Sequence, residues 1–138
     1  MRKVILLATL LFTGQLTYAL EVMVCVSFSM PQTLLEATLK EAADYQIPVV
    51  LNGLIDNSMA KTAERLMTLS RDIPNLTLQI DPTAFERFGI QQVPALVVAE
   101  GHRFDVLYGN LRLKEGLYRL VEGDAGLTNA FVRSLTHD

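Results

Sequence analysis

The sequence predicts an α/β domain with a central mixed β-sheet and helices on both faces. Two observations support this prediction. Strand-like apolar runs alternate with helix-like segments in the order β-α-β-α-β-α-β-β-α. The first strands are joined by helices, as parallel strands are, whereas only two residues separate the last two strands, which favours an antiparallel hairpin. The length of 138 residues suits one domain with a single core.

Residues 1–19 have the features of a secretory signal peptide. A basic start at 1–3 precedes an apolar run at 4–12, and Thr17 and Ala19 supply the small side chains found before a cleavage point. A retained membrane anchor is the alternative, but the apolar run is roughly half of the ~20 residues that span a bilayer. We therefore expect cleavage after Ala19, a periplasmic location and no membrane insertion afterwards.

The rest of the chain divides into a domain at 20–123 and a C-terminal extension at 124–138. The formal net charge is −3, and loss of Arg2 and Lys3 with the signal peptide makes the mature chain more acidic. Nucleic acid and anionic lipid are therefore not expected partners. The single cysteine excludes an internal disulfide.

The run at 22–28 alternates between two sets of side chains that are both largely apolar or small, which predicts an interior strand covered on both faces. The alternation places Cys25 on the same face as Ser27. Ser29 and Gln32 match a capping box, so the first helix is expected to begin there.

That helix should end near Tyr45 and bury a stripe that contains Leu35, Leu39 and Ala42. A second buried strand is predicted at 47–54, with Pro48 at its start. The second helix should follow N-cap candidates at 56–58 and end near residue 73. Its predicted buried face consists of Met59, Ala63, Leu66, Met67 and Ser70.

A half-exposed strand is predicted at 76–80, and Asp81 before Pro82 should cap a short helix that stops at Gly89. Two strands at 95–100 and 103–108 then form the hairpin. Its two-residue turn, Gly101-His102, suits type II′.

The last predicted helix of the domain runs from 111 to 122, with Asn110 as its cap. In the extension, a further helix is expected to lie back on the domain, and a partner-docking tail is the alternative. The residues that share its face are Leu127, Ala130, Phe131, Ser134 and Leu135.

The element order and the segment GIQQVPALVV at 89–98 resemble the thioredoxin fold. The resemblance implies that Pro94 follows a cis peptide bond and faces the start of the first core helix, where that fold carries a C-x-x-C. A trans proline at a strand edge is the alternative.

This sequence has serines, not a cysteine pair, at the corresponding elbow, residues 27–31. A hydroxyl cannot exchange electrons with a disulfide, so two-thiol redox chemistry is excluded. Cys25 lies in the strand, too early to be activated by a helix terminus, and is expected to be buried and inert. Its alternative role is that of an accessible single thiol, as a redox partner or peroxide sensor.

The sequence predicts no catalytic, cofactor or metal site. His102 and His137 are the only histidines, and neither is placed to serve as a base at the elbow. These two residues and one strand cysteine make no recognisable ligand set. The elbow and the proline segment are instead expected to flank a groove that binds an extended partner segment. For Met30, packing in the core is the alternative role. The predicted groove residues are Ser27, Ser29, Met30, Pro31, Val93 and Pro94.

Four blocks in order resemble the exported TrbC proteins of F-type conjugative transfer systems: VSFSMP at 26–31, VVLNGLIDNS at 49–58, IDPTAFERFGI at 80–90 with VPALVV at 93–98, and YGN at 108–110. The resemblance implies a thioredoxin-like periplasmic protein with a non-catalytic role in conjugative pilus assembly and type IV secretion. It also implies TraW-like transfer proteins as partners, while direct contact with pilin stays open. A degenerate thiol-disulfide or chaperone-like protein that uses Cys25 is the alternative.

Overall fold

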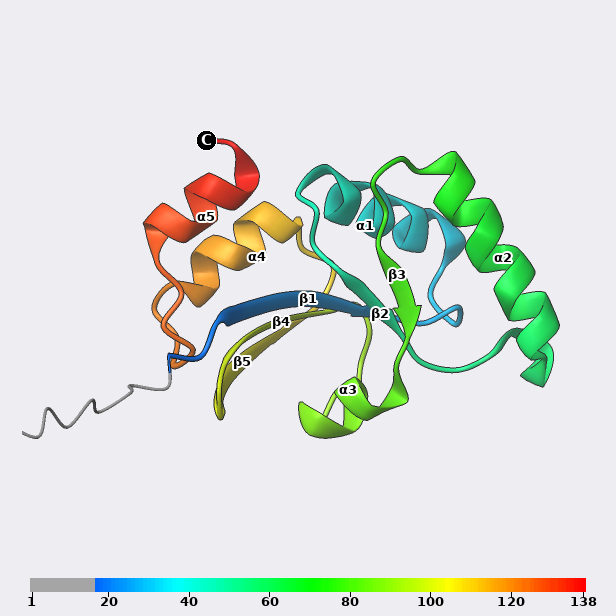
Figure 1. The fold of residues 1–138 in the computed structure, drawn as a ribbon, viewed down its shortest axis with the longest axis horizontal. Helices are drawn as coiled ribbons and strands as arrows, with labels where there is room; N and C mark the ends of the chain where they lie inside the picture. The colour runs from blue at the N-terminus through cyan, green and yellow to red at the C-terminus, as the bar shows by residue number, and fades with distance from the viewer. Residues whose placement is uncertain (1–16) are drawn as a thin grey trace, which may run out of the picture.

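A five-stranded sheet organises residues 17–138, the part of the chain that this computed structural model describes (Figure 1). The strands lie in the order β3-β2-β1-β4-β5. β1, β2 and β3 are parallel, β4 is antiparallel to β1, and β5 is antiparallel to β4. Their bounds are Leu20–Val26 for β1, Val49–Leu51 for β2, Leu78–Ile80 for β3, Ala95–Glu100 for β4 and Arg103–Tyr108 for β5.

Helices cover both faces of the sheet, as predicted. Four of them lie on one face, and α3 lies on the other (Figure 1). The helices on the first face are α1 (Gln32–Asp44), α2 (Met59–Asp72), α4 (Leu113–Leu120) and α5 (Asn129–Thr136), and α3 spans Pro82–Arg87. A β-α-β unit and a β-β-α unit that meet through antiparallel strands at the centre of the sheet make this a thioredoxin-like fold.

The core has two layers, one on each side of β1. Val24 and Val26 point into the layer beneath the four helices, whereas Cys25 points into the smaller layer beneath α3. All three side chains have no exposed surface. The prediction of an interior strand covered on both faces is therefore confirmed.

β2 is shorter than the predicted strand at 47–54. Pro48 has no N–H to continue the pairing, although its carbonyl accepts from Val24 N–H at 3.0 Å. After Leu51 the chain leaves the sheet at Gly53, where φ is 89°. A proline and a left-handed glycine thus limit the strand on its two sides.

Only Leu66 of the predicted buried face of α2 packs against the core, so most of that prediction is wrong. Met59 and Met67 are 59% and 74% exposed, and the helix instead buries Thr62 and Leu69. The Thr62 hydroxyl accepts from Ile55 N–H at 2.9 Å and donates to the Ser58 carbonyl at 2.7 Å. Thr62 can therefore lie on the inner face of α2, because both of its hydroxyl hydrogen bonds are made within the protein. A pattern of hydrophobic residues does not reveal such a position.

The predicted caps have mixed outcomes. The Ser58 hydroxyl accepts from Lys61 N–H at the start of α2, and the Asp81 carboxylate accepts from Thr83 N–H at the start of α3, so both are confirmed. The capping box at Ser29 is wrong, because α1 begins after Pro31 and has no side-chain cap.

The predicted start of the last domain helix is also wrong. Its N-cap is Arg112, not Asn110, and it provides no side-chain cap. The carboxylate of Glu41, on α1, accepts from Lys114 N–H at 3.3 Å. The cap therefore comes from a distant helix, which no local pattern could indicate.

The C-terminal helix α5 lies against α4 (Figure 1). It buries Val132 and Thr136, while Ala130 and Ser134 of the predicted face are exposed. The hydroxyl of Tyr118, on α4, donates to the Asp138 carboxylate at 3.1 Å. These contacts join the C-terminal helix to the same core as α4.

Most of the predicted signal peptide lies outside the described residues, which begin at residue 17. Within residues 17–138, no helix combines the length and the hydropathy required to cross a membrane.

Asp105 joins β5 to the segment between α4 and α5. Its carboxylate accepts from Asp124 N–H at 3.1 Å and from Ala125 N–H at 2.9 Å. A Cβ at Gly123 would collide with the Asp105 carboxylate, so glycine fits best beside this contact.

Replacement of Asp105 by alanine should lower the free energy of unfolding by about 2 kcal/mol, because hydrogen bonds to a charged acceptor are lost and two N–H groups lose their partner. Urea denaturation measures the change. The control is Asp124→Ala, an exposed position in the same segment, with a change near zero. Equal losses in the two variants would contradict the role assigned to the Asp105 carboxylate.

Candidate functional site

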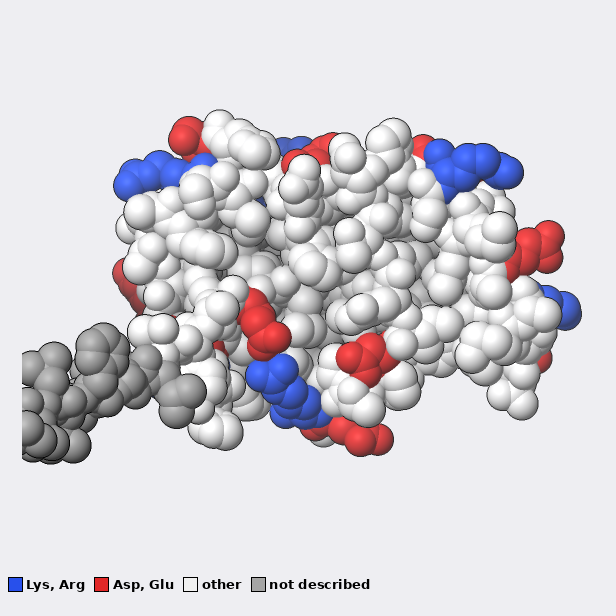
Figure 2. All heavy atoms as spheres, in the orientation of Figure 1, with Lys and Arg blue, Asp and Glu red and all other residues white. Residues whose placement is uncertain are grey.

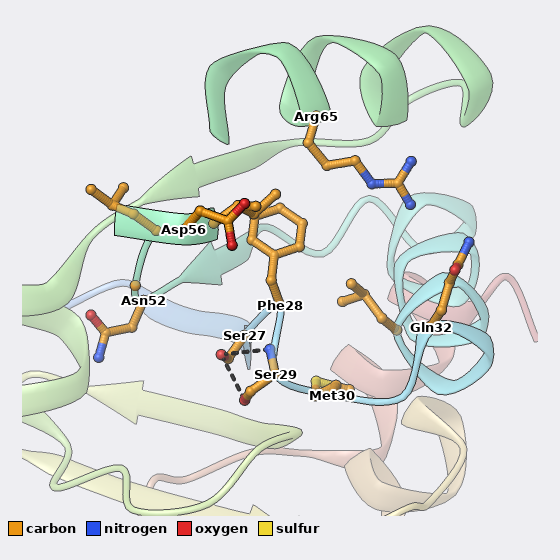
Figure 3. A pocket seen from close by; sticks show the side chains of 12 residues that line it. Ser27, Phe28, Ser29, Met30, Gln32, Asn52, Asp56 and Arg65 are labelled. Atoms are coloured by element: carbon orange, nitrogen blue, oxygen red, sulfur yellow. Dashed lines mark hydrogen bonds between the residues drawn. The ribbon is translucent and has the colours of Figure 1, made fainter. Parts of the chain in front are cut away.

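The elbow between β1 and α1 is a tight turn held by its own serines. Met30 N–H donates to the Ser27 carbonyl at 3.2 Å, and Ser29 N–H donates to Ser27 Oγ at 3.2 Å. The two hydroxyl oxygens lie 2.9 Å apart (Figure 3). The serines therefore hold the turn in place, and each hydroxyl has a partner within it.

This elbow forms one wall of a hollow of about 470 Å³. The opposite wall comes from the loop between β2 and α2 and from Arg65 of α2, whose side chain reaches toward Gln32 in Figure 3. The lining consists of Ser27, Phe28, Ser29, Met30, Gln32, Leu35, Asn52, Gly53, Leu54, Ile55, Asp56 and Arg65.

The wall opposite the elbow has a fixed backbone. Asp56 and Asn57 adopt left-handed conformations, with φ of 48° and 53°. Thr62 holds this turn by accepting from Ile55 N–H, and Lys61 Nζ donates to the Asp56 carboxylate at 2.9 Å. The sequence prediction missed this wall. The spacing of Ser58 and Thr62, a cap followed by a hydroxyl one helical turn later, is the signal that could have suggested it.

Arg65 is the basic side chain of the hollow. Its guanidinium lies 3.8 Å from the Glu36 carboxylate, which is too long for a hydrogen bond. Both side chains are about one-third exposed, at 33% and 38%. The guanidinium donors thus remain available to an acceptor that enters the hollow.

The structure separates the six predicted groove residues. Ser27, Ser29 and Met30 line the hollow, and Met30 is also part of the core with 7% of its surface exposed. Pro31 is exposed at the helix start and is not among the lining residues.

Val93 and Pro94 lie on the other side of β1 from the hollow. The Val93–Pro94 peptide bond is cis. Both residues directly precede β4, which pairs with the edge of β1 opposite β2. Pro94 itself is buried and lines a separate cavity of about 10 Å³ near the start of α4.

Cys25 is fully buried on the α3 side of the sheet. Burial, together with the nearby Asp81 carboxylate, raises the pKa of the thiol to about 12. The reactive thiolate form is thus disfavoured at neutral pH. The sulfur is therefore neither at the elbow nor ionised.

Fold and site together define a class: a thioredoxin-like domain whose elbow carries hydrogen-bonded serines where a thiol pair would stand. Residues 24–133 match the type-F conjugative transfer system pilin assembly proteins, TrbC_Ftype, and the chain belongs to this family.

Two individual proteins are also similar to the chain. The periplasmic protein TrbC of Escherichia coli (strain K12) is 38% identical over 114 residues, which cover 82% of this chain and 50% of that protein. The chain thus spans about half the length of this relative. The solved structure of MTB DsbF in its mixed oxidized and reduced forms aligns with a TM-score of 0.49 and 21% identity, covering 74% of this chain and 78% of that one.

The native protein should resist thiol reagents, because Cys25 is buried and its thiol pKa is raised. We expect negligible labelling by a maleimide near neutral pH and complete labelling in denaturant, both measured by intact mass. Fast labelling of the folded protein would contradict the buried, protonated thiol.

Proposed function

We propose that this chain is a periplasmic assembly factor of a type-F conjugative pilus that acts through protein contacts without catalysis. The observation that carries the proposal is the chemistry of the elbow. Ser27 and Ser29 bond to each other there, and the one thiol of the chain, in Cys25, is buried in the sheet. Family membership and the periplasmic location given in the name of the E. coli relative support the setting.

The elbow hollow is the proposed site for a partner. Its volume of about 470 Å³ suits a few side chains of an extended segment. Phe28 and Leu35 offer apolar contact, while Asn52 and the Arg65 guanidinium offer hydrogen bonds to a partner backbone or carboxylate. The rigid walls keep the entropic cost of binding low. TraW-like transfer proteins are the proposed partners, and pilin is a second candidate.

The surface charge suits a protein partner better than a nucleic acid. In the described part of the face drawn in Figure 2, Lys, Arg, Asp and Glu lie mostly around the rim, and a broad uncharged area crosses the middle. Basic and acidic side chains alternate along that rim. Nucleic acid binding generally relies on a concentrated basic surface.

Charge reversal at the hollow should impair pilus assembly. Arg65→Glu places a carboxylate near Glu36 and removes the guanidinium donors, so we expect pilus number and mating frequency to fall at least ten-fold in a complemented deletion strain. Arg71→Glu is the matched control, because Arg71 belongs to the same helix and its side chain is 76% exposed outside the hollow. The proposal fails if both variants assemble pili equally well.

Removal of the sulfur should leave the function intact. Cys25→Ala deletes one buried atom at a cost of about 1 kcal/mol, and we expect normal mating frequency when the protein level is matched by immunoblot. A loss of pilus assembly at an unchanged protein level would favour the thiol-based alternative.

A further inference from the structure

The outer edge of β5 is open within residues 17–138. β5 is the last strand of the sheet and has six residues, whereas β3, at the opposite edge, has three. Gly109 N–H donates to the Pro94 carbonyl at 3.3 Å, so the N–H of Gly109 points toward β4. Because this direction alternates along an antiparallel strand, Phe104, Val106 and Tyr108 direct their backbone groups outward.

The same three residues carry an apolar stripe on the α3 face of the sheet. Phe104 and Tyr108 are 42% and 38% exposed. The Phe104 ring packs edge-on against Phe88 with centroids 5.1 Å apart, and the Tyr108 hydroxyl donates to the Gly89 carbonyl at 3.2 Å. Both aromatic rings are therefore held in place beside an open strand edge.

β5 lacks the usual protection of an edge strand. Its sequence, RFDVLY, contains neither lysine nor proline. Its two charged residues, Arg103 and Asp105, point to the opposite face, where Asp105 binds the segment after α4. Nothing in the strand itself prevents another strand from pairing with it.

We propose that a second copy of this chain pairs with β5, antiparallel, with Val106 of both copies on the two-fold axis. In this register Phe104 of each copy lies opposite Tyr108 of the other, and Val106 lies opposite Val106. The outward-facing backbone N–H and carbonyl groups of all three residues then form hydrogen bonds with those of the other copy. The result is one continuous sheet with α3 on the same side in both copies.

Other registers fit less well. A shift by one residue would place outward-facing backbone groups opposite inward-facing ones. A shift by two residues would leave a backbone group without a partner and separate Phe104 from Tyr108. Of these registers, only the one centred on Val106 gives every outward-facing backbone group a partner and also forms two aromatic cross-strand pairs. It places no like charges opposite each other.

The self-complementary order of the strand is the reason for choosing a second copy over an unrelated strand. A two-fold pairing uses the same edge on both copies, so assembly closes at two. This surface is distinct from the elbow hollow, which lies toward α2 on the other side of β1. The dimer goes beyond the proposed function and does not depend on it.

The first test is the mass of the expressed chain in solution, measured by light scattering and sedimentation across micromolar concentrations. We expect twice the chain mass for the wild type and a monomer for Val106→Pro. The proline removes the central outward N–H, which makes no bond within the copy, so the circular dichroism should not change. Phe104→Ala should raise the dimer dissociation constant about ten-fold, since two aromatic pairs are lost.

A cross-linking experiment tests the register independently of that proline. Val106→Cys should give a covalent dimer with a short bis-maleimide, whereas Met67→Cys, on the exposed face of α2, should not. Native Cys25 is buried and should not compete. A wild type that is monomeric throughout, or a folded Val106→Pro dimer, or equal cross-linking of both cysteine variants would overturn the proposal.

Discussion

Strand β1 is paired on both sides, its C-terminal residues are buried on both faces, and the rest of the domain is arranged around it. β2 and β4 bond to its two edges, with Val24 and Val26 in one core layer and Cys25 in the other. Burial on both faces requires apolar or small side chains throughout this stretch. It also keeps the only thiol of the chain away from solvent.

The end of β1 positions one wall of the elbow hollow. The strand stops at Val26, and the serine-held turn that follows leads directly into α1. Because β2 lies on one side of β1 and β4 on the other, the turn lies between the loop that follows β2 and the segment that precedes β4. The loop after β2 lines the hollow, and Val93 and Pro94 directly precede β4 on the other side of β1. At this turn two hydrogen-bonded serines lie beside the hollow.

The candidate site depends on contacts between segments that are distant in the sequence. Thr62 holds the 3-10 turn at Ile55–Asn57 against α2, and this contact fixes the far wall. Arg65 reaches the hollow only because α2 presents Thr62 and Leu69 to the core. The predicted face contained Met59 and Met67, which are exposed, and did not contain Thr62, whose hydroxyl is hydrogen-bonded on the inner side of the helix. Methionine is usually buried and threonine is usually exposed, so residue type alone indicates the wrong burial for these side chains.

The sequence by itself determined the order of the elements, the mixed sheet, the caps at Ser58 and Asp81, the hairpin strands and the absence of a thiol pair at the elbow. These features follow from local chemistry: alternation, N-cap side chains and the residue types at a turn. Only the tertiary structure decided the short β2, the cap that Glu41 gives to α4, the face that α2 buries and the wall that faces the elbow. Each of these depends on a partner brought close by folding, and local patterns carry no information about such partners.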